Sequence, residues 1–296
     1  MIRNILVPLD GSKETESILP EVQRIASLRD KVHFIHVVPP MHFPIGTPPT
    51  RVIEFLEQAL AYLQATRLRW LPDQHGLDLV RTGDPASEIL GAALEKNINL
   101  IAMSTHGRSS LGCLLLGSVA SEIVRKAQLP VLLARPDVPR SSRPVQRILV
   151  GVEGTEAAPD LLETVKNLAG GSKAEIVLFH VAPRVVDPAP QWAFSSQLSI
   201  LADPEHRLQE LADALENEGY VAWPLVARGE PVEEILAQSR KLDVDLIALA
   251  THARTGLERI LEGSVAEGVL RRSPTAVLLQ RPLLMKKPVL QEGRHA

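Results

Sequence analysis

The sequence predicts an α/β protein built from two tandem domains, each a five-stranded, doubly wound parallel sheet. The chain has 296 residues, which is about two domains of ordinary size. Short runs of Val, Ile and Leu alternate with helical patterns, which is typical of parallel strands buried on both faces. The second half of the chain also repeats the first. These three observations together define the fold class.

The repeat extends over a whole domain. Residues 100–136 align with residues 246–282 without a gap, and 18 of these 37 positions are identical. Residues 3–12 (RNILVPLDGS) likewise resemble residues 146–155 (QRILVGVEGT). So long a period indicates domain duplication rather than a solenoid. A Pro- and Ser-rich segment separates the copies and is typical of a linker. We therefore expect domains at 1–136 and 146–283, a linker at 137–145 and a tail at 284–296.

The elements of the first copy follow from its apolar runs and helix signals. Asp84 and Pro85 predict a helix start, because Asp is a good N-cap and Pro suits the first turn. The predicted helices cover residues 12–28, 50–71, 85–96 and 118–127. The predicted strands are Ile5–Leu9, Val32–Val38, Asp78–Arg81, Leu100–Met103 and Val131–Ala134. Their counterparts are Ile148–Val152, Ile176–Val181, Ala222–Val226, Leu246–Leu249 and Ala276–Leu279.

Composition excludes several classes of protein. The formal net charge of −3 argues against nucleic acid as a partner, because duplex binding requires a basic face. No apolar stretch approaches the roughly 20 residues of a membrane span, and the first residues do not resemble a signal peptide. The single cysteine, Cys113, excludes a disulfide framework and suits a reducing compartment. We expect a cytoplasmic protein.

Ligands of open parallel sheets bind beyond the carboxyl ends of the strands, where the strand order reverses. Asp10 follows the first predicted strand, and Ser104 and Gly107 follow the fourth. Gly117 and Ser118 open the next helix, whose first amides could bind an anion. Such spacing also fits a simple helix cap, so the residues alone leave both interpretations open.

The chain resembles the universal stress protein family in its tandem form. The segments that carry the resemblance are ILVPLDGS, HVVP, GDPASEI and STHGRSSLGCLLLGSVASEIVRKAQLPVLLARP, and all four have counterparts in the second copy. The resemblance implies a Rossmann-like fold of the adenine nucleotide alpha hydrolase-like type. It also implies an ATP site, with or without Mg²⁺, in which the glycine-rich segment meets the phosphates, Asp10 the ribose and adenine, and Val37 the base. The residues expected to bind nucleotide are Asp10, Val37, Ser104, Gly107, Gly117, Ser118 and Val119.

Both copies depart from the family's signature. Ser104 stands where the first glycine belongs, and it would be strained if that position needed a positive φ. In the second copy Ala250 and Ala253 replace two glycines, and Glu262 precedes Gly263. We expect this second site to be degenerate; its residues are Glu153, Val181, Gly263 and Ser264.

No catalytic residue or metal site is predicted. The repeated histidines, His36 with His180 and His106 with His252, are expected to be structural, because a metal needs three or four converging ligands. The resemblance implies a stress-response or regulatory protein that binds ATP with little or no turnover. The alternative is an interaction module that binds no nucleotide, and a slow ATPase is a third hypothesis.

Assembly is predicted from the last strand of each copy, which would leave an exposed edge. The resemblance implies that Val131–Ala134 and Ala276–Leu279 pair within the chain and form an intramolecular pseudo-dimer. Two chains could also associate as a homodimer.

Overall fold

The computed structural model describes residues 4–40, 43, 46–106, 116–138, 143–152, 159–182, 203–251 and 265–281. The predictions for Gly107, Glu153, Gly263 and Ser264 lie outside these residues, as do the tail and part of the linker. The elements of the N-terminal half are β1 (Asn4–Pro8), α1 (Lys13–Glu16), α2 (Leu19–Ile25), β2 (Lys31–Val38), α3 (Pro49–Trp70), β3 (Asp78–Thr82), α4 (Pro85–Glu95), β4 (Leu100–Ser104), α5 (Ser118–Lys126) and β5 (Val131–Ala134). Those of the C-terminal half are β6 (Arg147–Gly151), α6 (Pro159–Ser172), β7 (Glu175–Ala182), α8 (Pro204–Asn217), β8 (Ala222–Arg228), α9 (Pro231–Lys241), β9 (Leu246–Ala250), α10 (Val265–Arg272) and β10 (Ala276–Gln280).

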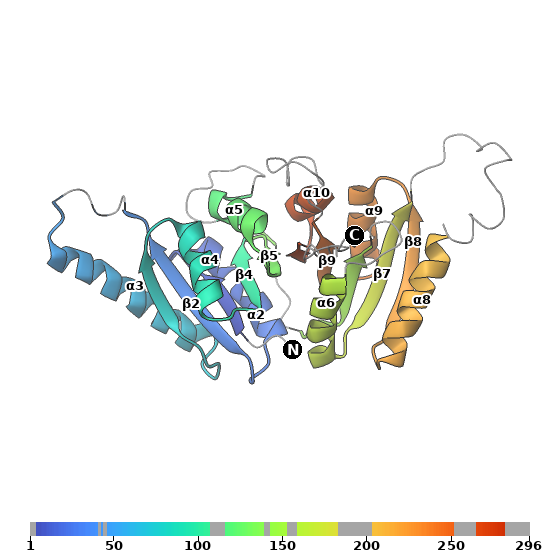
Figure 1. The fold of residues 1–296 in the computed structure, drawn as a ribbon, viewed down its shortest axis with the longest axis horizontal. Coiled ribbons are helices and arrows are strands. Elements are labelled where there is room, and N and C mark those ends of the chain that lie inside the picture. The colour runs from blue at the N-terminus through green and yellow to red at the C-terminus, as the bar shows by residue number, and fades with distance from the viewer. Residues whose placement is uncertain are drawn as a thin grey trace, which may run out of the picture.

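The strands form one ten-stranded sheet in the order β3-β2-β1-β4-β5-β10-β9-β6-β7-β8 (Figure 1). Neighbouring strands within each half are parallel, as the sequence predicts. The junction between the halves is different, because β5 and β10 pair antiparallel, with Leu132 opposite Leu278. The carboxyl ends of the strands in the two halves therefore point in opposite directions.

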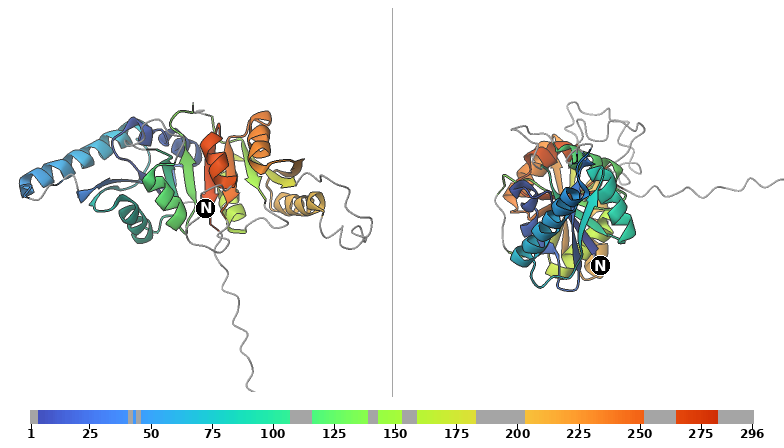
Figure 2. Two further views of the ribbon diagram at one scale, coloured as in Figure 1. Left: turned by 90° about the horizontal axis from the view of Figure 1, so that it is seen from above. Right: turned by 90° about the vertical axis from the view of Figure 1, so that its left-hand side faces the viewer.

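Helices cover both faces of this sheet. Helices α2, α3, α6 and α8 contribute to one apolar layer, and α4, α5, α9 and α10 contribute to the other. Figure 2 shows the two halves end to end, and β5 and β10 are the strands at which they meet. Each layer contains buried residues from both halves, and β5 and β10 supply side chains to both layers. The layers are mainly aliphatic, in keeping with a sequence that has only 3% aromatic residues.

One predicted helix, residues 12–28, is wrong as a single element. The structure contains α1 and α2 in its place, separated by Ser17 and Ile18. Pro20 explains the break, because a proline cannot donate to the carbonyl four residues earlier, and its ring would clash with that carbonyl. In the first turn of a new helix the missing donor costs nothing, and Pro20 occupies such a position in α2.

A buried ionic network joins the halves at α2. Arg24 donates to Glu21 at 2.8 Å and to Asp245 of the other half at 2.5 Å, and these side chains are at most 4% exposed. The second carboxylate oxygen of Asp245 accepts from the backbone amides of Gln146 and Arg147. The network therefore connects α2, the end of the linker and the start of β9.

In the part of the chain that the structure describes, no helix combines the length and the hydropathy required to cross a bilayer.

Candidate functional site

The strand order reverses at β1 and β4. Strand β1 pairs with β2 on one side and with β4 on the other, and Ile5 and Leu6 lie opposite Leu100 and Ile101. The ends of β1 and β4 therefore share one edge of the sheet. Asp10 and Ser104 are brought to that edge, as the sequence predicts.

Asp10 is held in place by the turn that follows β1. Its Oδ1 accepts from the amide of Ser12 at 2.9 Å, from the Ser12 hydroxyl at 2.5 Å and from the Thr15 hydroxyl at 2.8 Å. Gly11 makes the turn possible with a φ of +86°, a conformation that side chains disfavour. Ser12 also caps α1 by accepting from the amide of Thr15. The carboxylate is thus oriented before any ligand arrives.

Thr15 contacts the candidate site residue Asp10, although no sequence pattern singled it out. Besides donating to Asp10, its hydroxyl accepts from the Asp10 amide at 3.3 Å. The available signal was the pairing of Ser12 with a hydroxyl residue three positions later, in the first turn of a helix. A capping pattern is not usually taken as evidence for a ligand site, because it has a sufficient local explanation.

Ser104 is the last residue of β4 and pairs with Ala134 of β5. Its backbone is extended, so serine carries no strain at this position. Its side chain is buried, and its Oγ lies 3.4 Å from both the Ser17 hydroxyl and the His106 amide, which donate to it. The departure from glycine is therefore compatible with the local structure.

Gly117 is the N-cap of α5 and has a φ of −57° and a ψ of 152°. Any residue can adopt these angles, so backbone conformation does not require glycine here. The Gly117 amide donates to the Thr105 carbonyl at 2.8 Å, which fixes the start of α5 beside the end of β4. Gly117 has no side chain with which to cap α5, so the amides of Ser118 and Val119 are presented at a helix start suited to an anion.

Val37 and Val119 pack against the same apolar layer. Val37 is the penultimate residue of β2 and lies opposite Arg81 of β3. Both valines are partly buried against the α4–α5 side of the sheet. The structure thus places Asp10, Val37, Ser104, Gly117, Ser118 and Val119 at or near the ends of β1, β2 and β4.

Three of the four repeated histidines have structural contacts, and His252 lies outside the described residues. His106 Nδ1 lies 2.8 Å from the Thr105 hydroxyl, and His180 Nδ1 lies 2.9 Å from the Val152 carbonyl. The ring of His36 packs edge-on against Tyr62. Among the described residues, no group of three or more His, Cys, Asp or Glu could hold a metal ion.

In the second half the structure describes Val181 from the predicted site. It lies in β7 opposite Ala227 and packs against the same apolar layer as Val37. One backbone hydrogen bond at the strand ends is common to both halves. The Thr105 amide donates to the Ala134 carbonyl, and the Thr251 amide donates to the Gln280 carbonyl, each at 2.9 Å. The strand ends have therefore kept their geometry despite the change from Ser104 to Ala250.

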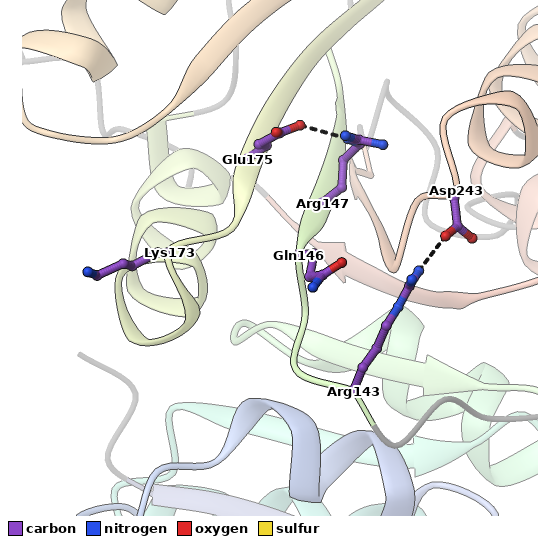
Figure 3. Close-up of a pocket in the computed structure, with 6 residues that line it drawn as sticks. All are labelled: Arg143, Gln146, Arg147, Lys173, Glu175 and Asp243. Carbon is purple, nitrogen blue, oxygen red and sulfur yellow. Dashed lines mark hydrogen bonds and ion pairs between the residues drawn. The ribbon is translucent and has the colours of Figure 1, made fainter.

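A cavity of about 330 Å³ lies elsewhere, at the amino ends of β6 and β7 (Figure 3). Its lining is charged, and much of it is already paired: Arg147 donates to Glu175 at 2.8 Å and Arg143 to Asp243 at 2.6 Å (Figure 3). Ligands of such sheets bind at the carboxyl ends of strands. This cavity is therefore distinct from both predicted nucleotide sites. Its lining residues are Arg143, Gln146, Arg147, Lys173, Glu175 and Asp243.

The family to which this fold belongs follows from comparison with known proteins. The model of the universal stress protein family matches residues 1–135 and again residues 144–281, so the chain belongs to that family and carries two of its domains.

Relatives of the same length support this assignment. A universal stress protein of Mycolicibacterium smegmatis is 24% identical over 298 residues, covering 94% of this chain and 97% of its own. Universal stress protein Rv2623 of Mycobacterium tuberculosis is 26% identical over 309 residues, covering 95% and 97%. The crystal structure of a universal stress protein from Archaeoglobus fulgidus shares the fold, with a TM-score of 0.70 at 21% identity over 94% of this chain and 96% of that one.

Proposed function

We propose that the N-terminal half binds ATP at the ends of β1 and β4, and that the chain acts as a regulatory, stress-response protein of the cytoplasm with little or no turnover. The observation that carries this proposal is Gly117. Its φ and ψ do not demand glycine, yet a residue without a side chain begins the helix that faces the strand ends. Close approach of a phosphate to the backbone explains that choice.

The rest of the site supports the same ligand. Asp10 presents an oriented carboxylate that could accept from ribose hydroxyls, and Val37 supplies apolar surface for a base. Gly107, which lies outside the described residues, would complete the phosphate segment. Mg²⁺, if it accompanies ATP, would be held largely by phosphate oxygens and water, as this ion usually is.

Turnover is not expected, because phosphoryl transfer needs positioned charge and a residue that orients the nucleophile. The segment from residue 104 to 119 has no carboxylate that could orient a nucleophile and no lysine, and Asp10 is expected at the ribose rather than at the phosphates. ATP would therefore act as a bound signal rather than a substrate.

We further infer that the β5–β10 pairing makes the chain an intramolecular pseudo-dimer, with a homodimer of chains as a further level of assembly.

Calorimetry with ATP and Mg²⁺ at pH 7 tests the proposal. We expect one ATP per chain, weaker binding of adenosine, and no steady release of phosphate. No heat at millimolar ATP would overturn the proposal.

The second candidate function is an interaction module that binds no nucleotide. Ser104, Ala250 and Ala253 favour it, because each replaces a glycine of the family's signature. Mass spectrometry of the small molecules released from denatured native protein separates the two functions. Recovered ATP would exclude the interaction module.

A further inference from the structure

The C-terminal end of α5 is bound by the other half of the molecule. Arg281 directly follows β10, and its Nη2 donates to the backbone carbonyl of Arg125 at 2.5 Å. Arg125 belongs to the last turn of α5, where carbonyls have no partner within the helix. A residue of the C-terminal half therefore caps the helix whose first residues face the nucleotide site of the N-terminal half.

The reverse contact also exists. Arg135 directly follows β5, and its Nη1 donates to the backbone carbonyl of Arg271, in the last turn of α10, at 2.7 Å. Arg135 and Arg281 occupy matching positions in the two copies, as do Arg125 and Arg271. The halves thus exchange arginine caps across the β5–β10 junction, and each arginine binds the helix that precedes the last strand of the opposite half.

The contact suits the electrostatics of a helix. A cation at the C-terminal end interacts favourably with the helix dipole, and the guanidinium also satisfies an orphan carbonyl. Helix α5 has only nine residues, so its two ends are about 13 Å apart. The Gly117 amide binds the Thr105 carbonyl at the first end of this short helix, and Arg281 binds the Arg125 carbonyl at the other end. Release of either end would loosen the orientation of the whole helix.

The second copy has kept this contact although several of its nucleotide residues changed. Arg281 is present, although Ala250, Ala253 and Glu153 replace the residues of the first copy. Gly263 and Ser264 are kept as well, but the contact that Arg281 makes serves α5 of the other half.

We propose that Arg281 is a positioning residue for phosphate binding in the N-terminal half. This inference rests on the proposed binding of ATP by that half. By holding the C-terminal end of α5, Arg281 orients the amides of Ser118 and Val119 toward the phosphates. The C-terminal half thereby acts as a built-in supporting subunit of the N-terminal site.

The test compares a nucleotide, ATP, with the nucleoside adenosine as ligands of the full chain. Arg281→Met should weaken ATP binding about fivefold, a modest coupling between distant groups. Adenosine affinity should not change, because adenosine has no phosphate for α5 to bind. Arg281→Lys should restore part of the ATP affinity, because lysine keeps the charge and a donor. Arg272→Met is the control: Arg272 pairs with exposed Glu233 within the C-terminal half, and its loss should leave both affinities unchanged.

The outcomes separate this inference from the function on which it rests. If wild-type protein binds no ATP, the proposed function fails and the positioning role fails with it. If wild-type protein binds ATP and Arg281→Met binds it equally well, only the positioning role is overturned. An equal loss for ATP and adenosine would also overturn it, because general loosening of the fold would then explain the effect. Hydrogen exchange in α5 should rise in Arg281→Met alone, and unchanged exchange would contradict the cap itself.

Discussion

The two halves share one topology but differ in residues near the contact between them. Asn99 and Asp245 occupy matching places before the fourth strand of each half, and both accept a hydrogen bond from the amide that begins the first strand. Asn99 is exposed, whereas Asp245 is buried against Arg24 of the other half. Duplication has preserved the local bond and changed the charge where the halves meet.

A similar divergence occurs inside the helices that follow the first strands. In α2 the buried polar residue is Glu21, which pairs with Arg24. In α6 the buried Thr164 donates to Gln280 of β10 at 2.8 Å. Glu21 thus belongs to the buried charged network that reaches Asp245 of the second half, whereas Thr164 binds a residue of its own half. The comparison shows that the halves are not interchangeable.

The largest difference between the halves in ATP binding is expected at Gly117 and its counterpart Gly263. Gly117→Val should abolish ATP binding, because a branched side chain would occupy the space that a phosphate needs beside the backbone. The matching change Gly263→Val should leave ATP binding nearly unchanged. Calorimetry with each variant measures both effects, and a stoichiometry near two or equal losses would contradict the asymmetry.

At the β5–β10 junction, matching substitutions in the two halves should lower the free energy of unfolding equally. Leu132 and Leu278 face each other across β5 and β10 and are at most 1% exposed. Leu132→Ala and Leu278→Ala should each lower the free energy of unfolding by about 3 kcal/mol in chemical denaturation. Because the two leucines are in one strand pair, their effects should not add.

Leu63→Ala is the control for that experiment. Leu63 is equally buried, but it lies in α3, outside the junction. Its effect should add to that of Leu278→Ala. Additive effects for Leu132 and Leu278 would show that the junction does not couple the halves.

A change of charge should affect stability at position 245, which is buried between the halves, but not at the matching exposed position 99. Asp245→Asn should lower the free energy of unfolding by about 2 kcal/mol, because it removes a partner of the buried Arg24 guanidinium. The reverse change in the first half, Asn99→Asp, should have an effect within about 0.5 kcal/mol, because position 99 is exposed. Urea unfolding of both variants checks the difference, and equal effects would contradict it.

The smallest difference is expected at two helix caps. Asp84 caps α4 by accepting from the Ser87 amide at 2.9 Å, whereas the matching Glu230 makes no side-chain cap bond to α9. Asp84→Ala should therefore lower the melting temperature by a few degrees, and Glu230→Ala should not. Calorimetric melting of the two variants measures this contrast.

The Asp84 effect should also depend on pH. The hydrogen bonds from Ser87 lower the pKa of Asp84 below its usual 3.8. A lowered pKa in the folded protein stabilises it above the unfolded-state value, and this contribution is lost as the pH falls through the folded value. The deficit of Asp84→Ala should therefore be present at pH 7 and disappear in strong acid. A deficit that persists there would exclude the carboxylate as its cause.

Local patterns predicted most of this fold. The apolar runs located each of the ten strands that the structure describes to within a few residues, and the Asp84–Pro85 pair located the start of α4. Pro20 could have predicted the break between α1 and α2, because its chemistry is local. The sequence also predicted that Asp10 and Ser104 lie at the ends of two strands that share one edge of the sheet, and β1 and β4 do so. Their role in nucleotide binding stays a prediction.

Contacts between the halves could not be predicted from local patterns. Arg24 meets Asp245 across 221 residues, and Arg281 meets Arg125 across 156. No periodicity specifies such pairs, because each partner is equally suited to a solvent-exposed helix end or turn. The strain considered for Ser104 also depended on a backbone angle that only the structure supplies, and its place in β4 removed that concern.

Among the described residues, the ten strands form one sheet whose outer strands are β3 and β8, and another chain could add to it by backbone pairing at these two edges. Strand β8 contains Pro224, which has no amide hydrogen to donate to a strand of another chain. Strand β3 carries Asp78 and Arg81, which are already paired with Arg67 and Glu95. A sheet of this width could otherwise serve as a template for fibre growth. Its edges instead carry the residues that natural proteins use to discourage polymerisation.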